Sequence, residues 1–202
     1  ECKTCTTQYD PDIDGMRAAI ECCHSLDDVD RDDIPVCSPS LKRSPQEVAD
    51  SEWSVEELLF LQAVWDAQQR RTHSLEYDFQ RDSMIRLREY AGLDAAAMVD
   101  LFDDDILRED TSHPHLLYSV SAKGRKVIGE HNREGIDHGA GKGDLGESSH
   151  HVMLVAFAED IAHTYRQDPE SGVETVESYY DLDDGHRLDV VGLDSQREVV
   201  LT

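Results

Sequence analysis

Two stretches decide the fold of the middle of this chain: AGLDAAAMVDLFDDDILRED over residues 91–110 and HLLYSVSAKGRKVIGE over residues 115–130. In the first stretch, apolar residues recur at helical spacing after Asp94, which predicts a helix. These residues are Met98, Leu101, Phe102 and Ile106. In the second stretch, residues alternate from Leu116 to Val120, and the pattern predicts a strand followed by a turn at residues 123–126.

Two further helices are expected before these stretches. Ser54 and Glu57 have the spacing of a capping box, and an apolar side then runs to about Gln69. A second helix is predicted over residues 79–91, and Gly92 is a typical residue to end it. Residues 53–131 therefore read as one compact helical unit with a strand near its end.

This order of elements resembles an archaeal winged helix-turn-helix domain over residues 51–131. The resemblance is carried by the pattern YxVxxKGRxxI, formed by Tyr118, Val120, Lys123, Gly124, Arg125 and Ile128. In that family the third helix enters the major groove of DNA and the wing contacts the backbone. The resemblance implies an α+β fold, with a wing that includes residues 123–126.

The charge pattern bears on DNA binding in two ways. The chain has 44 acidic and 19 basic side chains, a net charge of −25 that repels nucleic acid at long range. A lysine-poor, acidic composition also resembles proteins of salt-in halophiles, whose self-repulsion is screened by molar salt. Residues 70–88 and 123–133 nevertheless hold nine of the 19 basic groups. The predicted DNA contacts are Arg81, Arg86, Arg88, Lys123, Arg125 and Lys126.

The third helix departs from the family pattern because it is acidic. Its acids are Asp94, Asp100, Asp103, Asp104 and Asp105. Phosphates are repelled by such a helix, so two interpretations stay open. Either DNA is held by the wing and the second helix, or the domain is a protein-interaction winged helix with no role in nucleic-acid binding.

Residues 1–50 contain all five cysteines and are expected to be rich in loops. The candidate metal ligands are Cys2, Cys5, Cys22, Cys23, His24 and Cys37. Two close thiolates and two more from a distant segment suit tetrahedral, structural zinc. Free thiols are the alternative, since the second pair does not have the spacing of a CxxC motif.

Residues 132–146 hold five of the 12 glycines and are predicted to form a linker. The GAGKGD string in it fails as a phosphate loop, because Gly143 stands where Ser or Thr is required. Residues 147–202 then predict a helix and three strands, with a hairpin turn at residues 183–185.

This last segment resembles the start of a restriction-endonuclease-like domain, with Glu147 near the helix and Asp189 in the middle strand. The resemblance implies a Mg²⁺-dependent nuclease site made of clustered carboxylates. The third acid of that motif is due where the sequence stops, so no catalysis is expected. Glu147 has a second interpretation, in which it closes a capping box with Asp144. Paired histidines at residues 150 and 151 are interpreted as solvated.

Together these patterns predict a DNA-binding module of a halophilic mobile-element or DNA-processing protein. The expected partner is double-stranded DNA, joined by a motor ATPase or a second copy of the chain. No apolar run approaches the length of a membrane span, and no signal peptide is recognised, so a cytoplasmic protein is expected. The first residue is Glu1 rather than Met, which favours an excised piece or a processed product.

Overall fold

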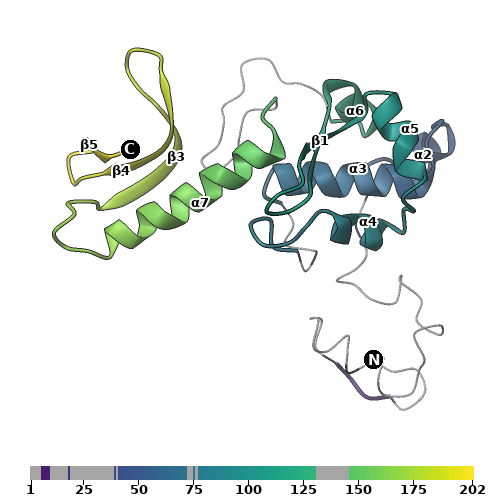
Figure 1. Cartoon of the computed structure of the whole chain (residues 1–202), viewed down its shortest axis with the longest axis horizontal. Helices are drawn as coiled ribbons and strands as arrows, with labels where there is room; N and C mark the ends of the chain where they lie inside the picture. Colours follow the sequence, from purple (N-terminus) through teal and green to yellow (C-terminus); the bar gives the residue numbers. More distant parts are fainter. Residues whose placement is uncertain are drawn as a thin grey trace.

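The structure is a computed structural model that describes residues 6–9, 18, 39, 41–71, 75, 77–130 and 146–202. This part of the chain is α+β, with six helices and two small antiparallel sheets (Figure 1). The helices are α2 (Pro45–Ala49), α3 (Val55–Gln68), α4 (Ile85–Ala91), α5 (Ala97–Asp103), α6 (Ala122–Val127) and α7 (Ser149–Arg166). The strands are β1 (Leu107–Thr111), β2 (Leu117–Val120), β3 (Thr175–Asp181), β4 (Arg187–Leu193) and β5 (Val199–Leu201). None of the described helices is both long and apolar enough to cross a bilayer.

The described residues between 41 and 130 form a first unit, and helix α3 lies at its centre. Helices α4, α5 and α6 and the β1–β2 hairpin surround α3 (Figure 1). The predicted capping box is confirmed, because the Ser54 side chain accepts from the Glu57 backbone and the Glu57 carboxylate accepts from the Ser54 backbone. The predicted end of α4 is also confirmed, since Gly92 adopts a left-handed conformation with φ of 74°.

The third helix is shorter than its apolar spacing predicts. It ends at Asp103, so Ile106, the last residue of that spacing, lies beyond it, and residues 107–111 form strand β1. Leu107 lies opposite Val120 and Glu109 opposite Tyr118 in an antiparallel hairpin. A run of three aspartates at the carboxyl end of a helix opposes the helix dipole, which explains why the helix stops there.

The predicted turn at residues 123–126 is wrong, because these residues lie inside helix α6. The Ser121 side chain caps that helix by accepting from the Gly124 backbone. The hairpin turns earlier, through residues 112–116, which we call the hairpin loop. Gly124 is required for close packing rather than for a turn, since a Cβ there would lie 2.3 Å from the Ile106 carbonyl oxygen.

The second sheet has the order β3-β4-β5, and α7 covers one of its faces (Figure 1). The predicted hairpin turn is present, with Gly185 at φ of 87° and the Leu182 amide donating to the His186 carbonyl. Helix α7 begins later than expected, and Ser148 caps it by accepting from the His151 backbone. Glu147 therefore lies before the cap, and its interpretation as part of a capping box is wrong.

Helix α7 contributes to two cores. Val152 and Met153, near its first turn, are buried in the core of the first unit. Further along, Val155 and Ala162 are buried, as are Val191 and Leu193 of the sheet that α7 covers. The predicted linker at residues 132–146 lies outside the described residues apart from its last one.

Candidate nucleic-acid interface and carboxylate cluster

Arg86 lies in the first turn of α4 and Arg81 lies just before that helix, beside the hairpin loop. The Arg81 side chain is 83% exposed and its Nε lies 3.6 Å from a carboxylate oxygen of Asp78. Arg86 is more enclosed, because its Nη1 lies 2.9 Å from Asp82 and its Nε donates to the Tyr90 hydroxyl at 2.7 Å. Burial alone would lower the pKa of Arg86, but Tyr90 and Asp82 raise it above its usual value.

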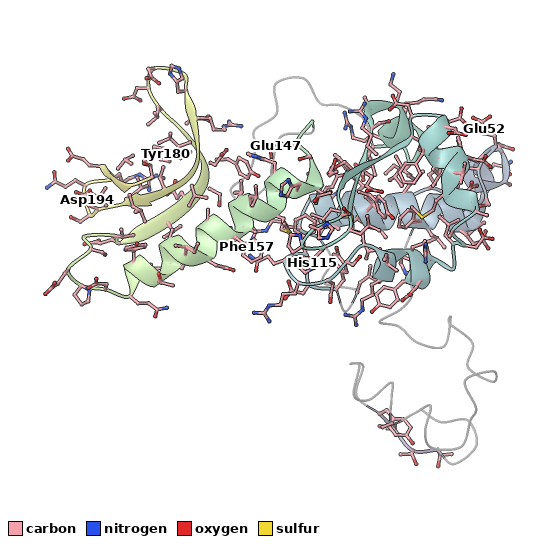
Figure 2. All side chains as sticks on the ribbon, in the orientation of Figure 1. Glu52, His115, Glu147, Phe157, Tyr180 and Asp194 are labelled. Carbon is pink, nitrogen blue, oxygen red and sulfur yellow. The ribbon has the colours of Figure 1, made fainter. Side chains whose placement is uncertain are left out.

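The hairpin loop is fixed to this end of α4 by backbone and ring contacts. The Met84 amide donates to the Leu116 carbonyl at 2.9 Å, and His115 Nε2 lies 3.0 Å from the Gln80 carbonyl oxygen. Figure 2 labels His115 below the hairpin, on the side of the first unit that carries α4. We call the group formed by Arg81, Arg86, His113 and His115 the hairpin–α4 surface.

Lys123 and Lys126 lie on α6 and are exposed. The Lys123 ammonium donates to the Asp104 carbonyl at 2.8 Å and lies 3.7 Å from the Asp104 carboxylate. Arg88, on α4, is half-buried, and its Nε has no hydrogen-bond partner within the described part of the chain. These three side chains therefore have different environments, although the sequence presents them as one basic set.

Arg125 does not lie on the surface, so we remove it from the predicted DNA contacts. It is 6% exposed, and its guanidinium carbon lies 5.5 Å from the centre of the Trp65 ring. Burial lowers the pKa of this guanidinium, and Arg108 lowers it further. A cation stacked on an aromatic ring inside the domain stabilises the fold and cannot reach a phosphate.

The predicted DNA contacts are divided between two sides of the first unit. Helix α4 and helix α6 lie on opposite sides of α3 (Figure 1). The arginines at the start of α4 are therefore separated from Lys123 and Lys126. The structure does not bring the two basic windows of the sequence together into one patch.

The acidic character of α5 persists in the structure. The Asp94 carboxylate caps its first turn by accepting from the Ala96 and Ala97 amides, both at 2.8 Å. Asp100 and Asp103 are exposed on the helix itself. A helix with this surface repels phosphates, and it is a poor candidate for insertion into a major groove.

In the second half of the chain, the structure brings Glu147 and Asp189 to the same histidine. His151 Nε2 lies 3.8 Å from Glu147 Oε1 and 3.4 Å from Asp189 Oδ1. The Tyr179 hydroxyl donates to Glu147 Oε2 at 3.0 Å. We call these four side chains the carboxylate cluster. Figure 2 labels Glu147 at the amino end of α7, between the first unit and the sheet.

Tyr179 has two unusual properties within this cluster. Its φ of 55° is a left-handed conformation that a tyrosine rarely adopts within a strand. Burial raises the pKa of its phenol, and the neighbouring Glu147 carboxylate raises it further. The phenol therefore stays protonated and acts as a hydrogen-bond donor to Glu147.

The carboxylate cluster does not fit the Mg²⁺ site that the nuclease resemblance implies. Mg²⁺ needs oxygen ligands in nearly octahedral geometry. Here the His151 ring lies between the two carboxylates, and no group of three His, Cys, Asp or Glu side chains among the described residues is arranged to hold a metal. The six candidate zinc ligands, Cys2, Cys5, Cys22, Cys23, His24 and Cys37, all lie outside the described residues.

Three side chains of these sites were not singled out by the sequence. The sequence pattern predicts a solvated His151 and assigns no role to Tyr179. Gln68 is buried, accepts from the Val120 amide at 2.8 Å and donates to the Glu147 carbonyl at 3.2 Å. The spacing of His151 and Glu147, four residues apart, was the one signal in the sequence that could have paired them.

Comparisons with known proteins found no match for this chain among protein-family models, curated proteins or solved structures.

Proposed function

We propose that this chain is a DNA-binding module of winged-helix type, adapted to high salt. The observation that supports the proposal is the order of elements around α3. Helix α4, a left-handed turn at Gly92, helix α5 and an antiparallel hairpin follow one another, as they do in winged helix-turn-helix domains.

We propose the hairpin–α4 surface as the DNA-contacting side. Arg81 is the most exposed of its cations, and His113 in the neighbouring loop is also exposed. The nearby Asp78 and Asp82 each hold one arginine by an ion pair, which a phosphate would have to replace. Such contacts are made to the backbone and give affinity without reading the base sequence.

Charge reversal on the two sides of α3 tests this proposal. The variant R81E/R86E removes the proposed contacts, and K123E/K126E makes the same change in net charge on the opposite side. Fluorescence anisotropy with a labelled duplex is measured in KCl at about 1 M, where the Debye length is about 3 Å.

We expect R81E/R86E to weaken binding at least about tenfold, the equivalent of about 1.4 kcal/mol, and K123E/K126E to bind like the wild type. Equal losses in both variants would mean that only net charge matters. Wild-type binding that no variant changes would also contradict the proposed surface. Circular dichroism controls for folding, because Arg86 has internal partners.

A protein-interaction role is the second candidate, and the acidic α5 favours it. Asp100 and Asp103 face solvent there, and no cation of the described residues pairs with either of them. This role predicts no duplex binding at any salt concentration. We propose no catalysis for the carboxylate cluster, because the His151 ring lies between its two carboxylates.

A further inference from the structure

We infer that the outer face of α7 is a docking surface for a second copy of this chain. The face consists of Leu154, Phe157, Ala158, Ile161 and Tyr165, which helical spacing places along one side. The exposed fractions of its four large side chains are 51%, 38%, 60% and 45% in chain order. Figure 2 labels Phe157 on the side of α7 that points away from the strands.

The charges of α7 are turned away from this face. The helix contains three residues of the types Asp, Glu, Lys and Arg, namely Glu159, Asp160 and Arg166. Glu159 pairs with Arg70, and Asp160 accepts from Gln80 at 2.8 Å, so both carboxylates face the first unit. Helical geometry places Arg166 about 100° around the axis from Tyr165. The outer face is therefore apolar in a chain whose residues are 31% charged.

The exposed area is sufficient for a reversible dimer. With roughly 150–250 Å² of surface per large side chain, the exposed fractions leave roughly 400 Å² of apolar surface on each copy. The largest contiguous apolar patch of a typical monomer measures roughly 300–600 Å² and is often functional. Two such faces bury roughly 800 Å² together, which lies in the range of weak and transient complexes.

A second copy fits this face better than a basic partner does. A basic protein gains most from the acidic surfaces of the chain, such as α5, and nothing from a face without charge. Two antiparallel copies of α7 around a twofold axis instead place Ala158 opposite Ile161 of the other copy, and Leu154 opposite Tyr165. A small residue then meets a large one in the first pair, and two large apolar side chains pack together in the second.

Salt decides whether the dimer forms. Each copy carries a net charge of −25, so two copies repel strongly in dilute buffer. At about 1 M salt this repulsion is screened beyond about 3 Å, while the apolar contact is kept. The dimer is therefore a property of the chain at high salt and is independent of the proposed DNA contacts.

Sedimentation velocity of the full chain in KCl at about 1 M, over a concentration series, tests the inference. We expect the wild type to pass from monomer to dimer in the micromolar range and L154E/I161E to stay monomeric. Val55→Glu is the matched control, since Val55 is 46% exposed on a different helix and its change should leave the dimer intact.

The proposed pairing of residues 154 and 165 across the two helices gives a second test, whose result differs from that of a variant that is only unstable. Leu154→Glu alone should weaken the dimer at least about tenfold, and adding Tyr165→Lys should restore much of it, because residues 154 and 165 of opposite copies meet. A wild type that stays monomeric overturns the inference. A dimer that persists in L154E/I161E, or a double variant L154E/Y165K that is no better than L154E, also overturns it.

Discussion

Gln68 joins both halves of the chain, and replacing it should reveal how strongly they depend on each other. The side chain is 2% exposed, and its amide bonds the Val120 amide of β2 and the carbonyl of Glu147. Gln68→Leu keeps the volume but leaves these two groups without partners. A buried polar group without a partner costs about 1–3 kcal/mol. We expect the free energy of unfolding to fall by about 2–4 kcal/mol.

Gln62 is a matched control on the same helix. It is 1% exposed, and neither of its amide atoms makes a well-formed hydrogen bond within the described chain; its weaker polar contact with the Asp66 carboxylate partly opposes the burial that raises the pKa of that group. Gln62→Leu should therefore leave the free energy of unfolding unchanged or raise it by about 1 kcal/mol. Replacing an unsatisfied amide by a hydrocarbon of similar size removes a cost that the folded state already bears.

Urea denaturation at constant molar KCl measures both variants, since urea leaves the ionic strength unchanged. Hydrogen exchange should add a local signature, in which the Val120 amide loses protection in Gln68→Leu and keeps it in Gln62→Leu. Equal stability changes in the two variants would refute the reasoning, because burial alone would then explain both.

Three further predictions follow from the packing and from the charges. Gly124→Ala should lower the free energy of unfolding by about 2–4 kcal/mol, because the new Cβ clashes with Ile106. Gly146→Ala is the control: it has open space around it and should change the free energy of unfolding by less than about 0.5 kcal/mol in the same denaturation assay. Arg125→Ala should destabilise the fold by about 1–3 kcal/mol and change Trp65 fluorescence, whereas Lys126→Ala should do neither. Above about pH 10 the free energy of unfolding should fall. Burial raises the pKa values of Tyr77 and Tyr179 above those of the unfolded chain, so the unfolded state releases more protons. Phenolate absorbance should therefore appear together with unfolding rather than before it.

The sequence predicted the elements that depend on local signals. The capping box at Ser54, the left-handed end at Gly92 and the hairpin turn at Gly185 each follow from a residue type with a strong backbone preference. The helix and three strands predicted over residues 147–202 are also present, as α7 and strands β3 to β5.

The failures have a common physical cause, which is long-range pairing. Ile106 keeps the apolar spacing of the third helix, yet the helix ends before it and residues 107–111 form a strand, because β2 offers them hydrogen-bond partners. The lysine-rich stretch after β2 carries turn-like residues, but packing of Gly124 against Ile106 holds it in a helix. Likewise, nothing local to Arg125 reveals the Trp65 ring that removes it from the surface.

Long-range hydrogen bonds also connect the two halves of the chain, which the sequence presented as separate parts. Glycines at residues 132–146 predict a hinge between independent parts, but Ser149, just beyond them, is fully buried against the hairpin. Its amide donates to the Asp110 carboxylate at 2.7 Å and to the Ser119 hydroxyl at 2.8 Å, and its own hydroxyl donates to the Tyr118 carbonyl.

Glu147, two residues before Ser149, is held by Gln68 from the first unit and by Tyr179 from the second. A ligand that shifts the hairpin must therefore disturb Ser149, and through it the backbone that carries Glu147. These buried hydrogen bonds connect the hairpin to the carboxylate cluster directly, so a response of one site to the other does not have to pass through the glycine-rich segment between them.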